Sequence, residues 1–128
     1  MIEIPEIIAA LIAAAGEDTV LAFLEAHGGT RLWVPRDPLK SQLCGMYGDE
    51  LAITISRELL HGWWTVPMLK GWRVVCYRNA GMTLSEIATR VGLSMSQVER
   101  LLAQARRDGV HVRAARRFEE TRQISLDF

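Results

Sequence analysis

Residues 83–105 read TLSEIATRVGLSMSQVERLLAQA, and their small and apolar side chains fall where two steeply crossing helices need them. Ala88 is a small residue at the point where the two backbones approach each other. Gly92, four residues on, can adopt the left-handed conformation of a tight turn. Val98 can pack the second helix against the first. The other inner positions are apolar as well, and the segment predicts a helix-turn-helix: Ile87, Val91, Leu93, Leu101 and Leu102.

Both predicted helices begin with a capping sequence. Thr83 with Glu86, and Ser94 with Gln97, match the S/T-x-x-E/Q capping box, which satisfies free backbone N–H groups at a helix N-terminus. An ordinary helical hairpin in an all-α core is the alternative interpretation. The combined spacing favours DNA binding over that alternative.

The charges of this chain are divided unevenly along its length. Its 15 basic and 15 acidic residues give a formal net charge of zero. Residues 1–66 hold four basic and nine acidic side chains, a net charge of −5, whereas residues 67–128 hold eleven and six, a net charge of +5. The basic half contains the helix-turn-helix, as phosphate binding requires.

Composition narrows the class of protein further. The 128 residues, 49% of them hydrophobic, suffice for one core or two small ones without metals or disulfides. The longest apolar run, residues 7–15, is too short to cross a bilayer and follows acidic residues, so we expect a cytoplasmic protein with no membrane contact. Cys44 and Cys76 lack metal or redox spacing, which predicts two buried free thiols.

No catalytic constellation accompanies the motif. Small helix-turn-helix domains also occur as DNA-binding tails of recombinases and nucleases. The sequence shows no paired carboxylates with a partner histidine, no nucleophilic serine in a glycine elbow and no metal-ligand spacing. We therefore expect no enzyme, no metal and no cofactor.

The N-terminal half contains an internal repeat with an offset of 32 residues. Residues 16–35 align with residues 48–67 without a gap, and the full copies are 7–35 and 39–67. Each copy predicts a leading helical piece, a glycine followed by two acidic residues, an apolar helix and a short strand that ends in Val-Pro. We expect the strands, 30–34 and 63–66, to pair with each other or with a strand of a partner chain.

These patterns predict a mainly α fold. Residues 1–67 form a helical association region with two short β-strands, and residues 68–109 form a three-helix helix-turn-helix domain. Its first helix spans 69–79, and its last begins at Met95 and ends near 108–109. Residues 110–128 are expected to be a basic extension followed by a mobile tail.

The second helix of such a motif places its N-terminal end in the major groove, where each base pair is distinct. The face opposite its apolar residues predicts four base-reading side chains: Ser96, Gln97, Arg100 and Gln104. Met95 is placed either on a thymine methyl or in the core. Basic residues and helix N-termini predict the phosphate contacts, which are Lys70, Arg73, Arg78, Thr83, Arg90, Ser94, Arg106 and Arg107.

The run LSEIATRVG at 84–92, together with GGTRLWVPR at 28–36, resembles the Mor/C family of phage transcription activators. The resemblance covers residues 39–107 best. It implies an intertwined N-terminal dimerisation region with a strand near the DNA, one helix-turn-helix per subunit, and activation of phage promoters through host RNA polymerase. The family has an aromatic residue before the aliphatic-Pro pair. Trp33 fits this pattern, but Thr65 holds the position in the copy next to the DNA-binding domain.

Recognition of double-stranded DNA normally requires two such motifs spaced by a helical turn, which predicts a homodimer. An alternative function resides in the last six residues, QISLDF, which resemble the Q-x-x-L-x-F peptide that docks into the bacterial sliding clamp. In that interpretation Gln123 fixes the register while Leu126 and Phe128 become buried on a host replication protein.

Overall fold

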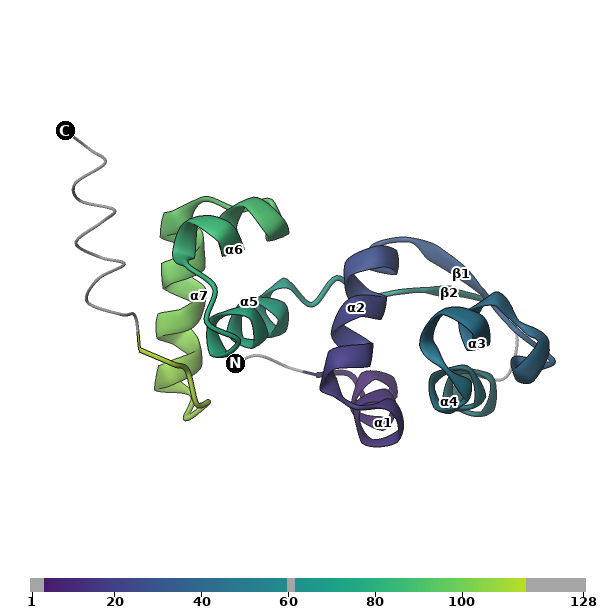
Figure 1. Cartoon of the computed structure of the whole chain (residues 1–128). Coiled ribbons are helices and arrows are strands. Elements are labelled where there is room, and N and C mark those ends of the chain that lie inside the picture. Colours follow the sequence, from purple (N-terminus) through teal and green to yellow (C-terminus); the bar gives the residue numbers. More distant parts are fainter. Residues whose placement is uncertain (1–3, 60–61, 115–128) are drawn as a thin grey trace. The chain divides into compact units, whose positions relative to one another are not determined.

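The computed structural model describes residues 4–59 and 62–114, and the fold is mainly α, as the sequence predicts (Figure 1). The described residues form two compact units, 4–69 and 70–114. The first unit contains both short strands, and the second contains three helices. Among the described helices, none combines the length and the apolar character needed to cross a bilayer.

The first unit consists of two successive helix–helix–strand segments. The first has α1 (Glu6–Ala15), α2 (Glu17–His27) and β1 (Arg31–Val34). The second has α3 (Gln42–Tyr47), α4 (Asp49–Leu59) and β2 (Gly62–Thr65), after a short 3-10 helix, η1 (Pro38–Lys40). The predicted repeat is present as structure, since α2 and α4 have the same length and lie 32 residues apart.

The break between the two helices of each copy has one cause. Gly16 and Gly48 occupy equivalent positions and have φ values of 91° and 94°, a region that favours glycine. The N–H of each glycine still bonds to the preceding helix. Two acidic residues then follow in the first turn of the next helix, where negative charge is favourable.

Strands β1 and β2 form a two-stranded antiparallel ribbon within the chain. Leu32 lies opposite Trp64, and Trp33 lies opposite Trp63. β1 begins one residue later than predicted and ends where predicted, and β2 begins and ends one residue earlier than predicted. The pairing continues beyond these limits through the bond from the Val66 N–H to the Thr30 carbonyl, at 2.9 Å. Of the two partners that the sequence allowed, the strands therefore pair with each other.

Burial in the first unit repeats with the sequence. Helix α1 packs on α4, and α2 reaches α3 through Phe23, whose ring meets that of Tyr47 at 5.4 Å, edge to face. The Phe23 ring also stacks on Trp64 at 6.2 Å, so it joins both copies. The equivalent core positions are buried in pairs, namely Leu11 and Leu43, Val20 and Ala52, Phe23 and Ile55, and Val34 and Val66.

The second unit is built from α5 (Lys70–Asn79), α6 (Leu84–Val91) and α7 (Met95–Arg107). The first of these helices starts one residue later than predicted, because Leu69 has a φ of 46° and does not belong to the helix. All three helices pack on one another. Seven of the ten residues of α5 are buried, which makes it the central helix of this unit.

The expectation of two buried thiols is correct for Cys76 and wrong for Cys44, which is half-buried. Cys44 lies in α3, and its thiol donates a hydrogen bond of 2.9 Å to Oδ1 of Asp49, the first residue of α4. This hydrogen bond to a carboxylate is the main cause that raises the pKa of the Cys44 thiol.

The Phe23 ring is fully buried where the two copies meet, so its removal is expected to weaken the whole first unit. Replacing Phe23 with Ala should lower the free energy of unfolding by about 3–5 kcal/mol. Trp33→Ala is the matched control, because its side chain is 52% exposed. Urea unfolding followed by far-UV circular dichroism measures both. Equal losses in the two variants would contradict the assigned core.

Candidate nucleic-acid interface

The turn between α6 and α7 has the backbone conformation that the sequence predicts for it. Gly92 ends α6 in the left-handed conformation, with φ 70° and ψ 38°. The carbonyl of Ala88 accepts from the N–H groups of both Gly92 and Leu93, the latter at 3.0 Å. Val98 of α7 is fully buried, as is Ile87 of α6. Ala88, Gly92 and Val98 therefore occupy the positions that the sequence predicts for them.

Only one of the two predicted capping boxes is complete. At the start of α7, the Gln97 N–H donates to Oγ of Ser94 at 3.1 Å, and the Ser94 N–H donates to Oε1 of Gln97 at 2.9 Å. At the start of α6, the Glu86 N–H donates to Oγ1 of Thr83 at 3.2 Å. The Glu86 carboxylate, however, accepts from the Thr83 hydroxyl at 3.0 Å instead of from its backbone. The start of α6 therefore has a single side-chain cap and not a capping box.

The first turns of α7 present an exposed face. Ser96, Gln97 and Arg100 are exposed, as predicted for residues that read bases. Met95 is 37% exposed, and Glu99 lies on the same open part of the helix. Met95 is therefore available for contact from outside rather than part of the core.

The two glutamines predicted to read bases are already hydrogen-bonded within α7. Oε1 of Gln97 already accepts one hydrogen bond in the cap, so a two-pronged contact with adenine requires this oxygen to accept a second one or the cap to open. Gln104 is half-buried. It donates to Oδ1 of Asp108 at 3.1 Å and accepts from Arg107 at 2.7 Å. Of the four residues predicted to contact bases, Ser96 and Arg100 are therefore the best placed, because they are exposed and no hydrogen bond within the cap or the last turn engages them.

Two of the predicted phosphate contacts, Arg73 and Arg78, do not fit the structure, because their side chains are buried. Arg73 is 7% exposed and donates to the Tyr77 hydroxyl at 3.2 and 3.3 Å. Arg78 is 3% exposed and donates to the Met82 carbonyl at 2.8 Å. They were predicted as phosphate contacts because they are basic, whereas nearly every face of α5 is covered.

The other predicted phosphate contacts lie within reach of solvent. Arg106 and Arg107 are exposed in the last turn of α7, and Arg90 is exposed in the last turn of α6 with its guanidinium 5.4 Å from the centre of the Tyr77 ring. Lys70 is half-buried at the start of α5. Thr83 and Ser94 cap α6 and α7, so each stands beside free N–H groups that suit a phosphate.

Asn79 has a role that the sequence analysis did not assign. Its side chain donates to the His111 carbonyl at 3.0 Å and accepts from the Arg113 N–H at 2.7 Å. Arg106 also donates to the Arg113 carbonyl, at 3.3 Å. The basic extension therefore begins as an attached segment, and its first residues are fixed beside α7. The sequence indicated this role only through the position of an asparagine at the end of the predicted helix 69–79.

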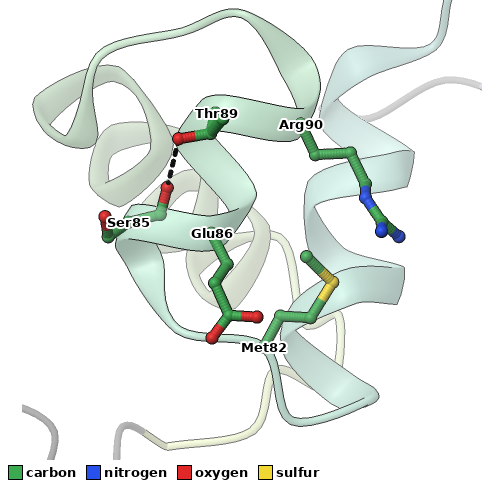
Figure 2. A pocket seen from close by; sticks show the side chains of 5 residues that line it. All are labelled: Met82, Ser85, Glu86, Thr89 and Arg90. Atoms are coloured by element: carbon green, nitrogen blue, oxygen red, sulfur yellow. Dashed lines mark hydrogen bonds between the residues drawn. The ribbon is translucent and has the colours of Figure 1, made fainter.

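An open depression of about 370 Å³ lies over α6 (Figure 2). Met82, Ser85, Glu86, Thr89 and Arg90 line it, and the Thr89 hydroxyl donates to the Ser85 carbonyl at 3.0 Å. Figure 2 shows the Glu86 carboxylate directed towards Met82 and the Arg90 guanidinium extended to one side. The lining combines hydroxyl groups with one charge of each sign, which suits contact with a polar surface.

Comparisons with protein-family models, with curated proteins and with solved structures found no match for this chain. The Mor/C resemblance thus stays a prediction from the quoted residues. The possible docking peptide with Gln123, Leu126 and Phe128 lies outside the described residues and also stays a prediction. The geometry of the second unit therefore carries the functional argument.

The complete cap on α7 is expected to stabilise the second unit measurably. Ser94→Ala removes the side-chain acceptor of the Gln97 N–H and should lower the free energy of unfolding by about 1 kcal/mol. Ser96→Ala is the matched control, since Ser96 is exposed two residues further on in the same helix. Chemical denaturation of both variants makes the measurement. A Ser96→Ala loss as large as that of Ser94→Ala would contradict the assigned cap.

Proposed function

We propose that this protein is a sequence-specific regulator that binds double-stranded DNA through the first turns of α7. The observation that carries the proposal is the combination of a left-handed Gly92 turn, a complete cap at Ser94 and an exposed helix face directly after that cap. A helix held in this way can enter the major groove with its N-terminal end first.

In this proposal, Arg100 and Ser96 make the principal base contacts. A guanidinium can donate two hydrogen bonds to guanine O6 and N7, and a serine hydroxyl can donate or accept. Met95 can contact a thymine methyl. Gln97 keeps Ser94 in the cap and offers its remaining amide N–H groups as single donors. In this division Gln97 and Gln104 contribute less to base contacts than Arg100 and Ser96.

Phosphate binding is assigned to the exposed cations and the capped helix ends. Arg90, Arg106 and Arg107 supply charge, while the N-termini of α6 and α7 supply N–H groups. Arg73 and Arg78 instead stabilise the second unit through Tyr77 and the Met82 carbonyl. The contacts with phosphate fix the position of the helix, and the contacts with bases give the sequence preference.

The resemblance to the Mor/C family adds a biological role to this proposal. It implies a phage or prophage activator that works in the cytoplasm of a bacterial host together with host RNA polymerase. The number of chains at each DNA site depends on the first unit.

A salt titration tests the proposal with a random-sequence DNA duplex. Each neutralised phosphate releases counterions, so the logarithm of the affinity should fall linearly with the logarithm of the salt concentration, with a slope of about −0.9 per phosphate. Arg106→Ala should make this slope smaller. Arg57→Ala, which removes an exposed cation from the first unit, serves as the control. Absent or salt-independent duplex binding would refute the proposal.

The role of Arg100 requires a separate comparison. Arg100→Ala should cost about 1–3 kcal/mol at the preferred sequence and relax the preference at one position. Arg106→Ala should weaken preferred and random duplexes by the same factor. Mobility-shift titrations with both duplexes distinguish these outcomes. If Arg100→Ala affected the two duplexes equally, Arg100 would be a phosphate contact and not a base reader.

A further inference from the structure

Helices from both copies of the repeat share one core. Helix α1 of the first copy packs on α4 of the second, and the equivalent pair, α2 and α3, meets through the Phe23 and Tyr47 rings. A single copy would leave its apolar face open, because each consists of two short helices and one strand. The core of residues 4–69 therefore exists only when both copies are present.

The register of the ribbon has the symmetry of a dimer. Leu32 and Trp64 are equivalent positions, and they lie opposite each other. On one side of this pair, Trp33 lies opposite Trp63, which is the equivalent of Arg31 in the second copy. On the other side, Arg31 lies opposite Thr65, which is the equivalent of Trp33. The same exchange relates the pairs Val34–Gly62 and Thr30–Val66. This pattern is the one that two identical strands form about a two-fold axis.

The chains that leave the two strands differ. After β2, residues 66–69 lead directly to α5 and the helix-turn-helix. After β1, the equivalent residues lead to η1 and then to α3, the start of the second copy. In the part of the chain that the structure describes, one helix-turn-helix thus accompanies an association region that already contains both halves.

We infer that residues 4–69 are a single-chain counterpart of a two-fold dimerisation region, and that the protein acts on DNA as one copy. Because β2 already occupies the symmetric partner position of β1, the equivalent strand of a second chain cannot take that position. The homodimer expected from the half-site argument is thereby replaced by an internal pair. The DNA part of this inference rests on the proposed function.

A single copy presents one α7 to the DNA. We therefore expect its partner to be a duplex that contains one half-site, of about the length that one recognition helix covers. Such a duplex needs no inverted repeat spaced by a helical turn. Arg113, whose backbone is held by Asn79 and Arg106, supplies a further cation to the same duplex.

A disulfide across the ribbon tests the internal pairing without DNA. In a Cys44→Ser background, Trp33→Cys combined with Trp63→Cys places two thiols on directly opposite residues of the exposed face. Mild oxidation should yield a product that migrates as a single chain of 14.4 kDa on a non-reducing gel. Products of twice this mass would overturn the inference, because they would show strands paired between chains. Trp33→Cys alone, which should not form the internal bond, is the control.

The unmodified full chain supplies a measurement that needs no substitution. Sedimentation velocity should show a monomer, and the melting temperature should not change with protein concentration. A dimer that persists on dilution, with a melting temperature that rises with concentration, would overturn the inference. This outcome is independent of DNA, so it does not bear on the proposed function.

Selection of duplexes from a random pool by the full chain tests the DNA part. Enriched sequences should contain a single half-site, and sedimentation with an enriched duplex should give one chain per duplex. Inverted repeats bound by two chains would overturn the inference while supporting the proposed function. A pool without enrichment would instead refute the proposed function, and the ribbon disulfide would still decide the internal pairing.

Discussion

The pairing of β1 with β2 is the contact on which the first unit depends. Each strand has four residues, and an isolated pair of this length is marginal in water. The ribbon becomes stable because its inner face, with Leu32, Val34 and Trp64, lies over helices from both copies, and the Phe23 ring stacks on Trp64. The pairing in turn requires that both copies lie side by side. The strand register, the packing of helices from both copies and the burial of the core therefore depend on one another.

Local chemistry made much of the fold predictable. The helix breaks at Gly16 and Gly48, the turn at Gly92 and the cap at Ser94 all depend on residues a few positions apart, and all are present in the structure. The partner of each strand was not predictable in the same way, because an alternating pattern specifies the inner face of a strand and not the chain that it pairs with. Only the packing of the two copies resolves that choice.

The candidate site shows where sequence reasoning stops. A helical pattern identified α5 but could not show that its polar side chains have partners inside the unit, as Arg73 has in Tyr77 and Arg78 in the Met82 carbonyl. A buried guanidinium must be hydrogen-bonded, so these arginines stabilise α5 and the loop that follows it. Gln97 illustrates the same conflict within one residue, since the oxygen that completes the cap is the oxygen that a base contact would need.

Charge assigns different tasks to the two halves of the chain. Residues 1–66 carry a net charge of −5, which disfavours the approach of phosphates, whereas residues 67–128 carry +5. A protein with one recognition helix lacks the second half-site that a dimer uses, so more of its affinity must come from phosphate contacts. Arg106 and Arg107 lie at the end of α7, and the Asn79 hydrogen bonds hold Arg113 near them. The attached start of the extension thus adds positive charge beside the helix that we propose reads the sequence.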